Sequence, residues 1–367
     1  MASVPTATLA EEYATLTEGC GVVDRSERGK LALTGSGAVE FLNGQVTNEL
    51  VGMEPGEGRY AAFLTHKGKM LGDLRILAVG PDPDGEPGEL LLDTERVALQ
   101  ALFDMIRRFK VGYDVELHKR TLECSLLSLI GPGAAEVAAA AFALDPSSGS
   151  SEPDEPFQPS EASERAEPEV GVFAGDDPPA RAGGLSEGEH VHRVVRLGDT
   201  RVRVIRTHVG CDLLFDADAL DTVRVALVDA GAVEVSEAAA EIVRVESGRP
   251  RYGLDLDETT IPQEAGLNER AVSFTKGCYV GQETVARLYY KGKPNRYLRG
   301  LRLSEPVEQG AELRLGERPV GRLGSSVLSP TFGPIGLAVV RREAEPGAIL
   351  TAGEGGVTAR VAELPFG

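Results

Sequence analysis

The chain has 367 residues and a formal net charge of −19, and 42% of its residues are hydrophobic. A chain of this length exceeds one ordinary core, so two or three domains are expected. No apolar run reaches the roughly 18 residues that span a bilayer, and the acidic N-terminal stretch lacks the basic patch of a secretory signal. Because so acidic a protein repels nucleic acid and anionic lipid, we expect no strong nucleic-acid binding and no membrane association.

Four cysteines, Cys20, Cys124, Cys211 and Cys278, are widely spaced and form no CxxC pair. This pattern favours reduced thiols over a disulfide framework or a zinc site. It therefore predicts a cytoplasmic protein without a metal centre.

The first 144 residues alternate between strand and helix patterns. A strand is predicted at 30–35 and a helix over 37–50. The stretch 58–79 predicts a hairpin whose turn lies at His66–Gly68. A strand then leads into a long amphipathic helix from about Glu95, and an apolar strand at 124–131 precedes a helix at 132–144.

A segment at about 145–190 is rich in Ser, Pro and Glu and almost free of apolar residues. It cannot bury enough surface to offset its ordering entropy, so it predicts a disordered acidic insertion that acts as a solvated spacer. Beyond it, 193–207 predicts a hairpin, and 219–235 predicts a helix that enters a strand. Since many strand pairs are tight hairpins, the chain is predicted to be α+β with antiparallel sheets.

From about residue 296 the pattern changes to short alternating runs separated by Gly or Pro. Such spacing is typical of a small β-barrel. We therefore expect an α+β region of two subdomains over 1–295, interrupted by the acidic insertion, and a C-terminal β-barrel over 296–367.

The octapeptide KGCYVGQE runs from Lys276 to Glu283. The stretch 270–274 before it predicts a strand or an extended arm, and the stretch 281–290 has helical spacing, which puts Cys278 at or just before a helix N-terminus. Free N–H groups and the helix dipole favour a thiolate there, and Lys276 and Arg287 add positive charge, so a thiol pKa below the usual value of about 8.5 would follow. The alternative, that Cys278 is a buried and inert residue, stays open.

A run of basic residues extends from Thr284 to Ser304 without a single acid. This basic run indicates either an anion site, for a phosphate, a polyglutamate tail or RNA, or a set of solvated strands and a linker. Its members are Arg287, Lys291, Lys293, Arg296, Arg299 and Arg302.

The octapeptide and its surroundings, residues 246–288, resemble the YgfZ family within the superfamily of glycine-cleavage T-proteins (aminomethyltransferases), and residues 41–77 resemble the superfamily's folate-binding domain. The resemblance implies a cloverleaf of domains around a channel that holds tetrahydrofolate, followed by a β-barrel. It implies Lys276 and Cys278 as catalytic residues. The cofactor-binding residues that it implies are Tyr279, Gly281, Gln282, Glu283, Arg287 and Asp212.

YgfZ-like proteins support the assembly or repair of iron–sulfur clusters in client enzymes, including tRNA-thiolating ones, so the resemblance implies such a role for this chain, as a monomer. T-proteins instead move a one-carbon unit to tetrahydrofolate. An ungapped comparison puts Leu99 or its neighbours where T-proteins carry the acid that faces the reacting carbon. It puts Cys211 where their glutamate grips the pterin, with Asp212 as the nearest substitute.

These departures predict a folate-dependent iron–sulfur factor without aminomethyltransferase activity, because that transfer would lack its electrostatic partner. The alternative is a folate-dependent one-carbon transferase that uses Cys278. A folate-free scaffold is a third possibility, which the intact octapeptide disfavours.

Overall fold

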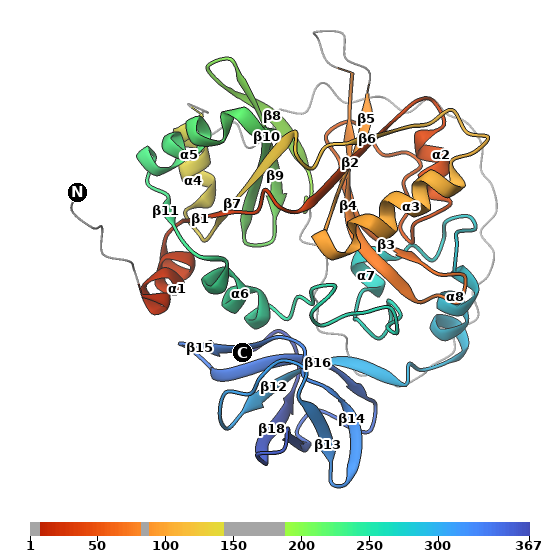
Figure 1. Ribbon diagram of the computed structural model, residues 1–367, viewed down its shortest axis with the longest axis vertical. Coiled ribbons are helices and arrows are strands. Elements are labelled where there is room, and N and C mark those ends of the chain that lie inside the picture. Colours follow the sequence, from red (N-terminus) through yellow and green to blue (C-terminus); the bar gives the residue numbers. More distant parts are fainter. Residues whose placement is uncertain (1–7, 82–87, 143–187) are drawn as a thin grey trace, which may run out of the picture.

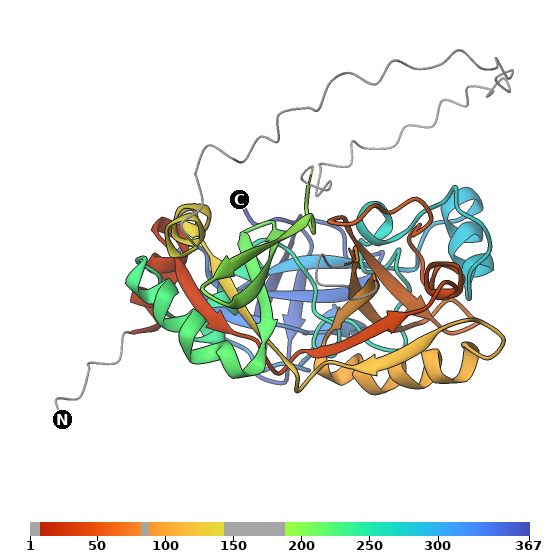
Figure 2. The same cartoon turned by 90° about the horizontal axis from the view of Figure 1, so that it is seen from above.

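The computed structural model of the protein describes residues 8–81, 88–142 and 188–367. Three sheets of five, six and seven strands lie around a common centre (Figure 1). Seen from above, the five- and six-stranded sheets stand side by side over the seven-stranded sheet (Figure 2). This arrangement confirms the predicted α+β class with antiparallel sheets in a cloverleaf.

The five-stranded sheet has the order β3-β4-β5-β2-β6, and its neighbouring strands are antiparallel. Helices α2 (Ala38–Asn43) and α3 (Leu99–Phe109) pack on one face, together with a short 3-10 turn η1 (Arg96–Ala98), and the core there includes Phe41 and Ile76. The hairpin predicted over 58–79 is present as β3 and β4. The strands are β2 (Gly29–Thr34), β3 (Gly58–Leu64), β4 (Met70–Val79), β5 (Glu89–Thr94) and β6 (Glu116–Lys119).

The six-stranded sheet has the order β11-β1-β7-β10-β9-β8 and is antiparallel except for the parallel pair β1 and β11. Helices α4 (Ala134–Ala141) and α5 (Leu220–Asp229) cover one face, and the turn η2 (Ala217–Ala219) leads into α5. Helices α1 (Leu9–Glu18) and α6 (Glu237–Glu246) pack against each other at its edge (Figure 1). The strands are β1 (Gly21–Asp24), β7 (Cys124–Ile130), β8 (His192–Leu197), β9 (Thr200–Thr207), β10 (Gly210–Asp216) and β11 (Val233–Glu234).

The seven-stranded sheet has the order β14-β13-β17-β18-β12-β16-β15 and curls into a half-barrel around its own apolar core. The C-terminal β unit expected from the sequence is therefore present, and its first strand begins at Arg296. The strands are β12 (Arg296–Leu303), β13 (Glu312–Leu315), β14 (Arg318–Arg322), β15 (Ser326–Ser329), β16 (Gly333–Arg341), β17 (Ile349–Ala352) and β18 (Val357–Ala362).

Two local expectations differ from the structure, and one helix was not predicted. The helix expected over 37–50 is only α2, since the Asn43 side chain accepts from the Leu50 N–H and holds a loop there. The stretch 270–274 is not a strand, because its first two residues end the short helix α7 (Asn268–Ala271). Helix α6 was not predicted, although it buries an apolar stripe. The predicted acidic insertion lies almost entirely outside the described residues.

Candidate functional site

A cavity of about 200 Å³ lies where the five- and six-stranded sheets meet α6 and the loop that follows it. In the described part of the chain it is lined by seven arginines and five carboxylates, so its surroundings are positive in a strongly acidic protein. The arginines are Arg25, Arg28, Arg75, Arg244, Arg249, Arg251 and Arg270, and the acids are Asp73, Asp93, Glu95, Glu189 and Asp212.

The two-residue period of the strands decides which side chains reach this cavity. On β4, Leu74 and Ile76 belong to the core beneath the helices, so Asp73 and Arg75 point to the opposite face. On β10, Cys211 belongs to the helix-covered core, and its neighbour Asp212 points into the cavity. Burial raises the pKa of the Cys211 thiol to about 12, which suits an apolar packing role.

Four of the five carboxylates form ion pairs with arginines. Arg75 donates to Asp212 Oδ2 at 2.6 Å and pairs with Asp93 Oδ2 at 2.8 Å, so it joins the two sheets. Burial alone would raise the pKa of Asp93 and Asp212, but the neighbouring arginines reverse this effect and leave both pKa values lowered. The other two pairs are Glu189 with Arg249 at 3.0 Å and Glu95 with Arg28.

Asp73 differs from these four acids. It is 5% exposed, forms no ion pair with any residue that the structure describes, and accepts a hydrogen bond from the Tyr60 hydroxyl at 2.7 Å. Burial raises the pKa of Asp73 to about 6, and the Tyr60 hydrogen bond offsets only part of that effect. A carboxyl with this pKa can exchange a proton near neutral pH or stabilise a developing positive charge.

The sequence comparison predicted no acid at Leu99 or its neighbours, and the cavity contains a carboxyl from another segment. Leu99 begins α3 and packs beside the core of the five-stranded sheet. Asp73, which lies 26 positions earlier, supplies a carboxyl inside the cavity. The sequence comparison considered the end of β5, whereas Asp73 comes from the middle of β4.

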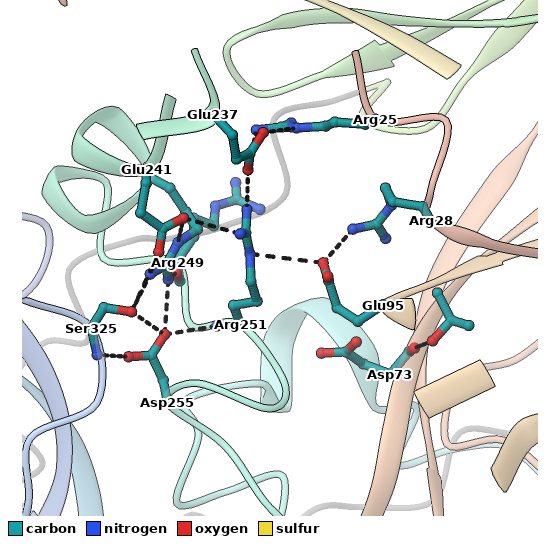
Figure 3. A network of polar contacts seen from close by, with 12 residues as sticks. Arg25, Arg28, Asp73, Glu95, Glu237, Glu241, Arg249, Arg251, Asp255 and Ser325 are labelled. Atoms are coloured by element: carbon teal, nitrogen blue, oxygen red, sulfur yellow. Dashed lines mark hydrogen bonds and ion pairs between the residues drawn. The ribbon is translucent and has the colours of Figure 1, made fainter. Parts of the chain in front are cut away.

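Arg251 closes the cavity on the side of α6. It donates to Glu237 at 2.6 Å, pairs with Glu241 at 3.2 Å, and lies 3.9 Å from Glu95 of the five-stranded sheet (Figure 3). Arg25 from the loop after β1 also pairs with Glu237, at 2.9 Å. Ion pairs therefore tie α6 to both neighbouring sheets around the cavity.

The ammonium group of Lys276, in the octapeptide, is surrounded by hydrogen-bond acceptors. Its Nζ donates to the Asn43 carbonyl at 2.7 Å and Oδ1 at 3.1 Å, to the Val46 carbonyl at 3.0 Å and to the Asn48 carbonyl at 2.6 Å. Burial lowers the pKa of Lys276 to about 8, and the four oxygens favour its charged form, so the ammonium persists at neutral pH. Lys276 thus fastens the loop that carries Cys278 to the loop after α2.

We predict that Lys276→Met will lower the free energy of unfolding by about 3 kcal/mol, because it leaves several buried carbonyls without a donor. Cys278→Ser, at an exposed thiol two residues away, should change it by less than about 0.5 kcal/mol. Urea unfolding followed by circular dichroism measures both. A Lys276→Met variant as stable as the wild type would exclude the structural role and favour the catalytic one.

The rest of the octapeptide lies around the start of α8 (Gln282–Lys291), which begins four residues after the exposed Cys278. Gly281 has φ of 85°, and a Cβ there would come within 2.6 Å of the Thr65 carbonyl, so glycine is required for the close approach to the β3–β4 turn. Tyr279 is buried, and burial raises its pKa to about 12.

Only Asp212 of the eight predicted site residues lines the cavity. The other seven lie outside its lining, so the structure does not bring Cys278 into the same pocket as Asp212. A cofactor role for these residues stays a prediction. They are Lys276, Cys278, Tyr279, Gly281, Gln282, Glu283 and Arg287.

The basic run divides into two groups, and no member of it lines the cavity. Arg296 pairs with Glu264 at 2.8 Å, and the guanidinium groups of Arg299 and Arg302 lie over aromatic rings, so these three serve the fold. The other three side chains are exposed to solvent. They are Arg287, Lys291 and Lys293.

Comparisons with known proteins agree with this architecture. The family model for the GCVT N-terminal domain matches residues 3–152. An aminomethyltransferase of Corynebacterium jeikeium is 26% identical, with 91% of this chain and 82% of that protein covered. A putative chloroplastic transferase of Arabidopsis thaliana is 26% identical, with 95% of this chain and 71% of that protein covered.

The crystal structure of the glycine cleavage system aminomethyltransferase T from Bartonella henselae has the same fold. It matches with a TM-score of 0.73 at 22% identity, and covers 98% of this chain and 89% of that chain. The match to the GCVT N-terminal domain and to aminomethyltransferases supports the glycine-cleavage T-protein superfamily, and the crystal structure shows the fold. Within the described ranges, no helix is long and apolar enough to cross a membrane.

Sequence reasoning missed most of the cavity, although one local signal was available. The stretch from Met70 to Val79 is apolar except for Asp73 and Arg75, which are two residues apart and share a face. Charged residues inside a strand that is otherwise buried need partners or a function. That pattern could have identified Asp73 and Arg75 as site residues, whereas their partners come from distant segments.

Proposed function

We propose that this chain binds tetrahydrofolate, or a derivative of it, in the central cavity. The observation that carries the proposal is Asp73, a buried carboxyl without a cationic partner among the described residues, which lies in a cavity lined by arginines and by Tyr60 and Tyr252. Such a mixture of aromatic surface and a few directed polar groups is typical of a site for a flat heterocycle. The superfamily placement supports the same ligand.

The size of the cavity suits one end of a folate. Its volume of about 200 Å³ is below the roughly 300 Å³ at which pockets for whole drug-sized ligands begin. The ring system would therefore sit inside, beside Asp73 and Tyr60, and the glutamate tail would extend toward the opening. Bound tetrahydrofolate would supply a nitrogen that accepts a one-carbon unit. Asp73 would hold or release a proton beside that nitrogen.

For the cellular role, we propose support of iron–sulfur cluster assembly or repair in client enzymes, such as those that thiolate tRNA, by a cytoplasmic monomer. The support is the intact KGCYVGQE octapeptide, which Lys276 anchors and which presents an exposed Cys278 on the surface. In this proposal the folate cavity and the thiol are separate sites. Cells that lack the protein should regain the activity of a client enzyme with the wild type and not with Cys278→Ser.

A second candidate is a folate-dependent one-carbon transferase, and Asp73 is the observation that favours it. A carboxyl with a pKa of about 6 supplies the electrostatic partner that the sequence comparison had not located. Cys278 does not line the cavity, so this reaction would rest on Asp73 in place of the thiol. Reconstitution of glycine cleavage with this chain tests this candidate, and turnover would displace the iron–sulfur proposal.

We predict that calorimetry will detect 5-formyltetrahydrofolate binding, and that the ligand will not slow the alkylation of Cys278 by iodoacetamide. The reason is that the exposed thiol lies outside the lining of the cavity. Absence of any folate binding would refute the proposed function. Protection of Cys278 would mean that the folate lies against the octapeptide and not in the cavity.

A further inference from the structure

His190 occupies an unusual position in the wall of the cavity. It is 7% exposed, and neither ring nitrogen has a hydrogen-bond partner. Its backbone φ is 70°, and it is the sole residue other than glycine with a positive φ in the part of the chain that the structure describes. A buried unpaired polar group costs about 1–3 kcal/mol, and a left-handed backbone adds about 1–2 kcal/mol. Strained and unsatisfied residues of this kind cluster at ligand and active sites.

The adjacent strand β3 leaves space for His190, because it has a glycine at the point of contact. A Cβ on Gly58, at the start of β3, would lie 2.5 Å from the His190 carbonyl oxygen and 2.7 Å from its Cβ. The His190 N–H donates to the Arg206 carbonyl at 2.9 Å, which fixes the backbone. The ring then lies with its centroid 6.2 Å from that of Tyr60, whose hydroxyl holds Asp73.

Two acids beside His190, Glu189 and Asp212, are already engaged by arginines. Glu189 accepts from both terminal nitrogens of Arg249, at 3.0 and 3.3 Å. Asp212 accepts from Arg75 at one oxygen and from the Ser128 hydroxyl at the other. Among the described residues, the buried side-chain atoms of the cavity lining that lack a hydrogen-bond partner are the two ring nitrogens of His190 and the Nε atoms of Arg75 and Arg270.

We propose that His190, assisted by Arg270, hydrogen-bonds the edge of the heterocycle in the cavity, and that it selects a ring with a donor and an acceptor side by side, such as the lactam edge of a reduced pterin. This inference rests on the proposed folate binding and assigns the recognition of the ring to an imidazole in place of a carboxylate. The two nitrogens of a neutral imidazole point in diverging directions, so one of them would accept from the lactam N–H while the unpaired Nε–H of Arg270 donates to the adjacent carbonyl. Burial and the nearby Arg75 lower the pKa of His190 to about 3, so the ring is neutral at pH 7.

The test compares three variants by calorimetry with 5-formyltetrahydrofolate at pH 7. His190→Phe keeps the ring and removes both nitrogens, and should weaken binding about 10- to 100-fold. His190→Asn keeps a donor and an acceptor and tolerates a positive φ, so it should stay within about 5-fold of the wild type. His192→Phe is the matched control, since His192 is also buried with an unpaired Nε2 but does not line the cavity, and its affinity should stay within about 2-fold.

Imidazole ¹⁵N chemical shifts give a second measurement that a structural role would not change. Addition of 5-formyltetrahydrofolate should move the His190 nitrogen signals and leave those of His192 in place. If the wild type binds the folate but His190→Phe binds equally well, or the His190 signals do not move, the inference is wrong and the proposed function stands. If the wild type binds no folate, both are overturned.

Discussion

Asp73→Asn will make the protein more stable at pH 8 and will change its stability much less at pH 4.5. Burial raises the pKa of Asp73 from 3.8 to about 6 in the folded state, which means that folding opposes its ionisation. The difference of about two pKa units corresponds to on the order of 3 kcal/mol at pH 8. An asparagine carries no charge to bury, and its carbonyl oxygen still accepts from the Tyr60 hydroxyl.

The direction of the pH dependence follows from the raised pKa. Below pH 3.8 the carboxyl is protonated in both the folded and the unfolded state, and it costs no stability. Between pH 3.8 and about 6 the unfolded state ionises first, so stability falls as the pH rises, and above pH 6 the full cost is present. The gain from Asp73→Asn should therefore be about 3 kcal/mol at pH 8 and about 1 kcal/mol at pH 4.5.

Asp93→Asn is the matched control, because Asp93 lies in the same cavity and has the opposite pKa shift. It pairs with Arg28 and Arg75 at 2.8 Å each, so its neutralisation removes one of the two carboxylates that each of these guanidinium groups contacts. This variant should lose about 3 kcal/mol at pH 8. Urea unfolding at the two pH values measures all of these changes. Equal gains for Asp73→Asn at both pH values would show that folding does not raise the pKa of Asp73.

Arg244→Ala will lower the free energy of unfolding by about 3–5 kcal/mol, since it breaks the network that joins α6 to the half-barrel. Arg244 donates to Asp255 Oδ2 at 2.9 Å, to Glu241 Oε2 at 3.0 Å and to the Ser325 hydroxyl just before β15. The Asp255 side chain is fully buried, so it cannot recover its hydration when the arginine is removed.

Arg244→Lys tests whether the planar guanidinium is needed in addition to the charge. A lysine supplies one ammonium and cannot reach three partners from different segments, so we expect about half of the alanine loss. Arg107→Ala is the exposed control, because Arg107 lies 4.0 Å from Asp104 and its side chain is 72% exposed. Its loss should stay below about 0.5 kcal/mol. A similarly small loss for Arg244→Ala would refute the idea that the network locks the half-barrel in place.

The sequence predicted the secondary structure that follows the octapeptide, but it did not predict which residues the octapeptide contacts. Helical spacing after Gly281 predicted α8, and the structure contains that helix. Nothing within the octapeptide indicated that Lys276 would turn toward carbonyls of the loop after α2, more than 220 positions earlier. The ammonium group of Lys276 anchors the loop, because a buried ammonium needs hydrogen-bond acceptors and the tertiary fold places four oxygens around it. Its predicted role in activating Cys278 stays a prediction.

The sequence by itself determined the features that depend on a few neighbouring residues. Alternation over 58–79 predicted the β3–β4 hairpin, periodic glycines and prolines predicted the C-terminal sheet, and the octapeptide pointed to the superfamily. The tertiary structure alone decided the site, since its central contact joins Arg75 to Asp212 across 137 positions and two sheets. Local periodicity predicts which face of a strand a side chain occupies. Only the packing of the three sheets decides which faces meet, and therefore which carboxyl has no arginine partner.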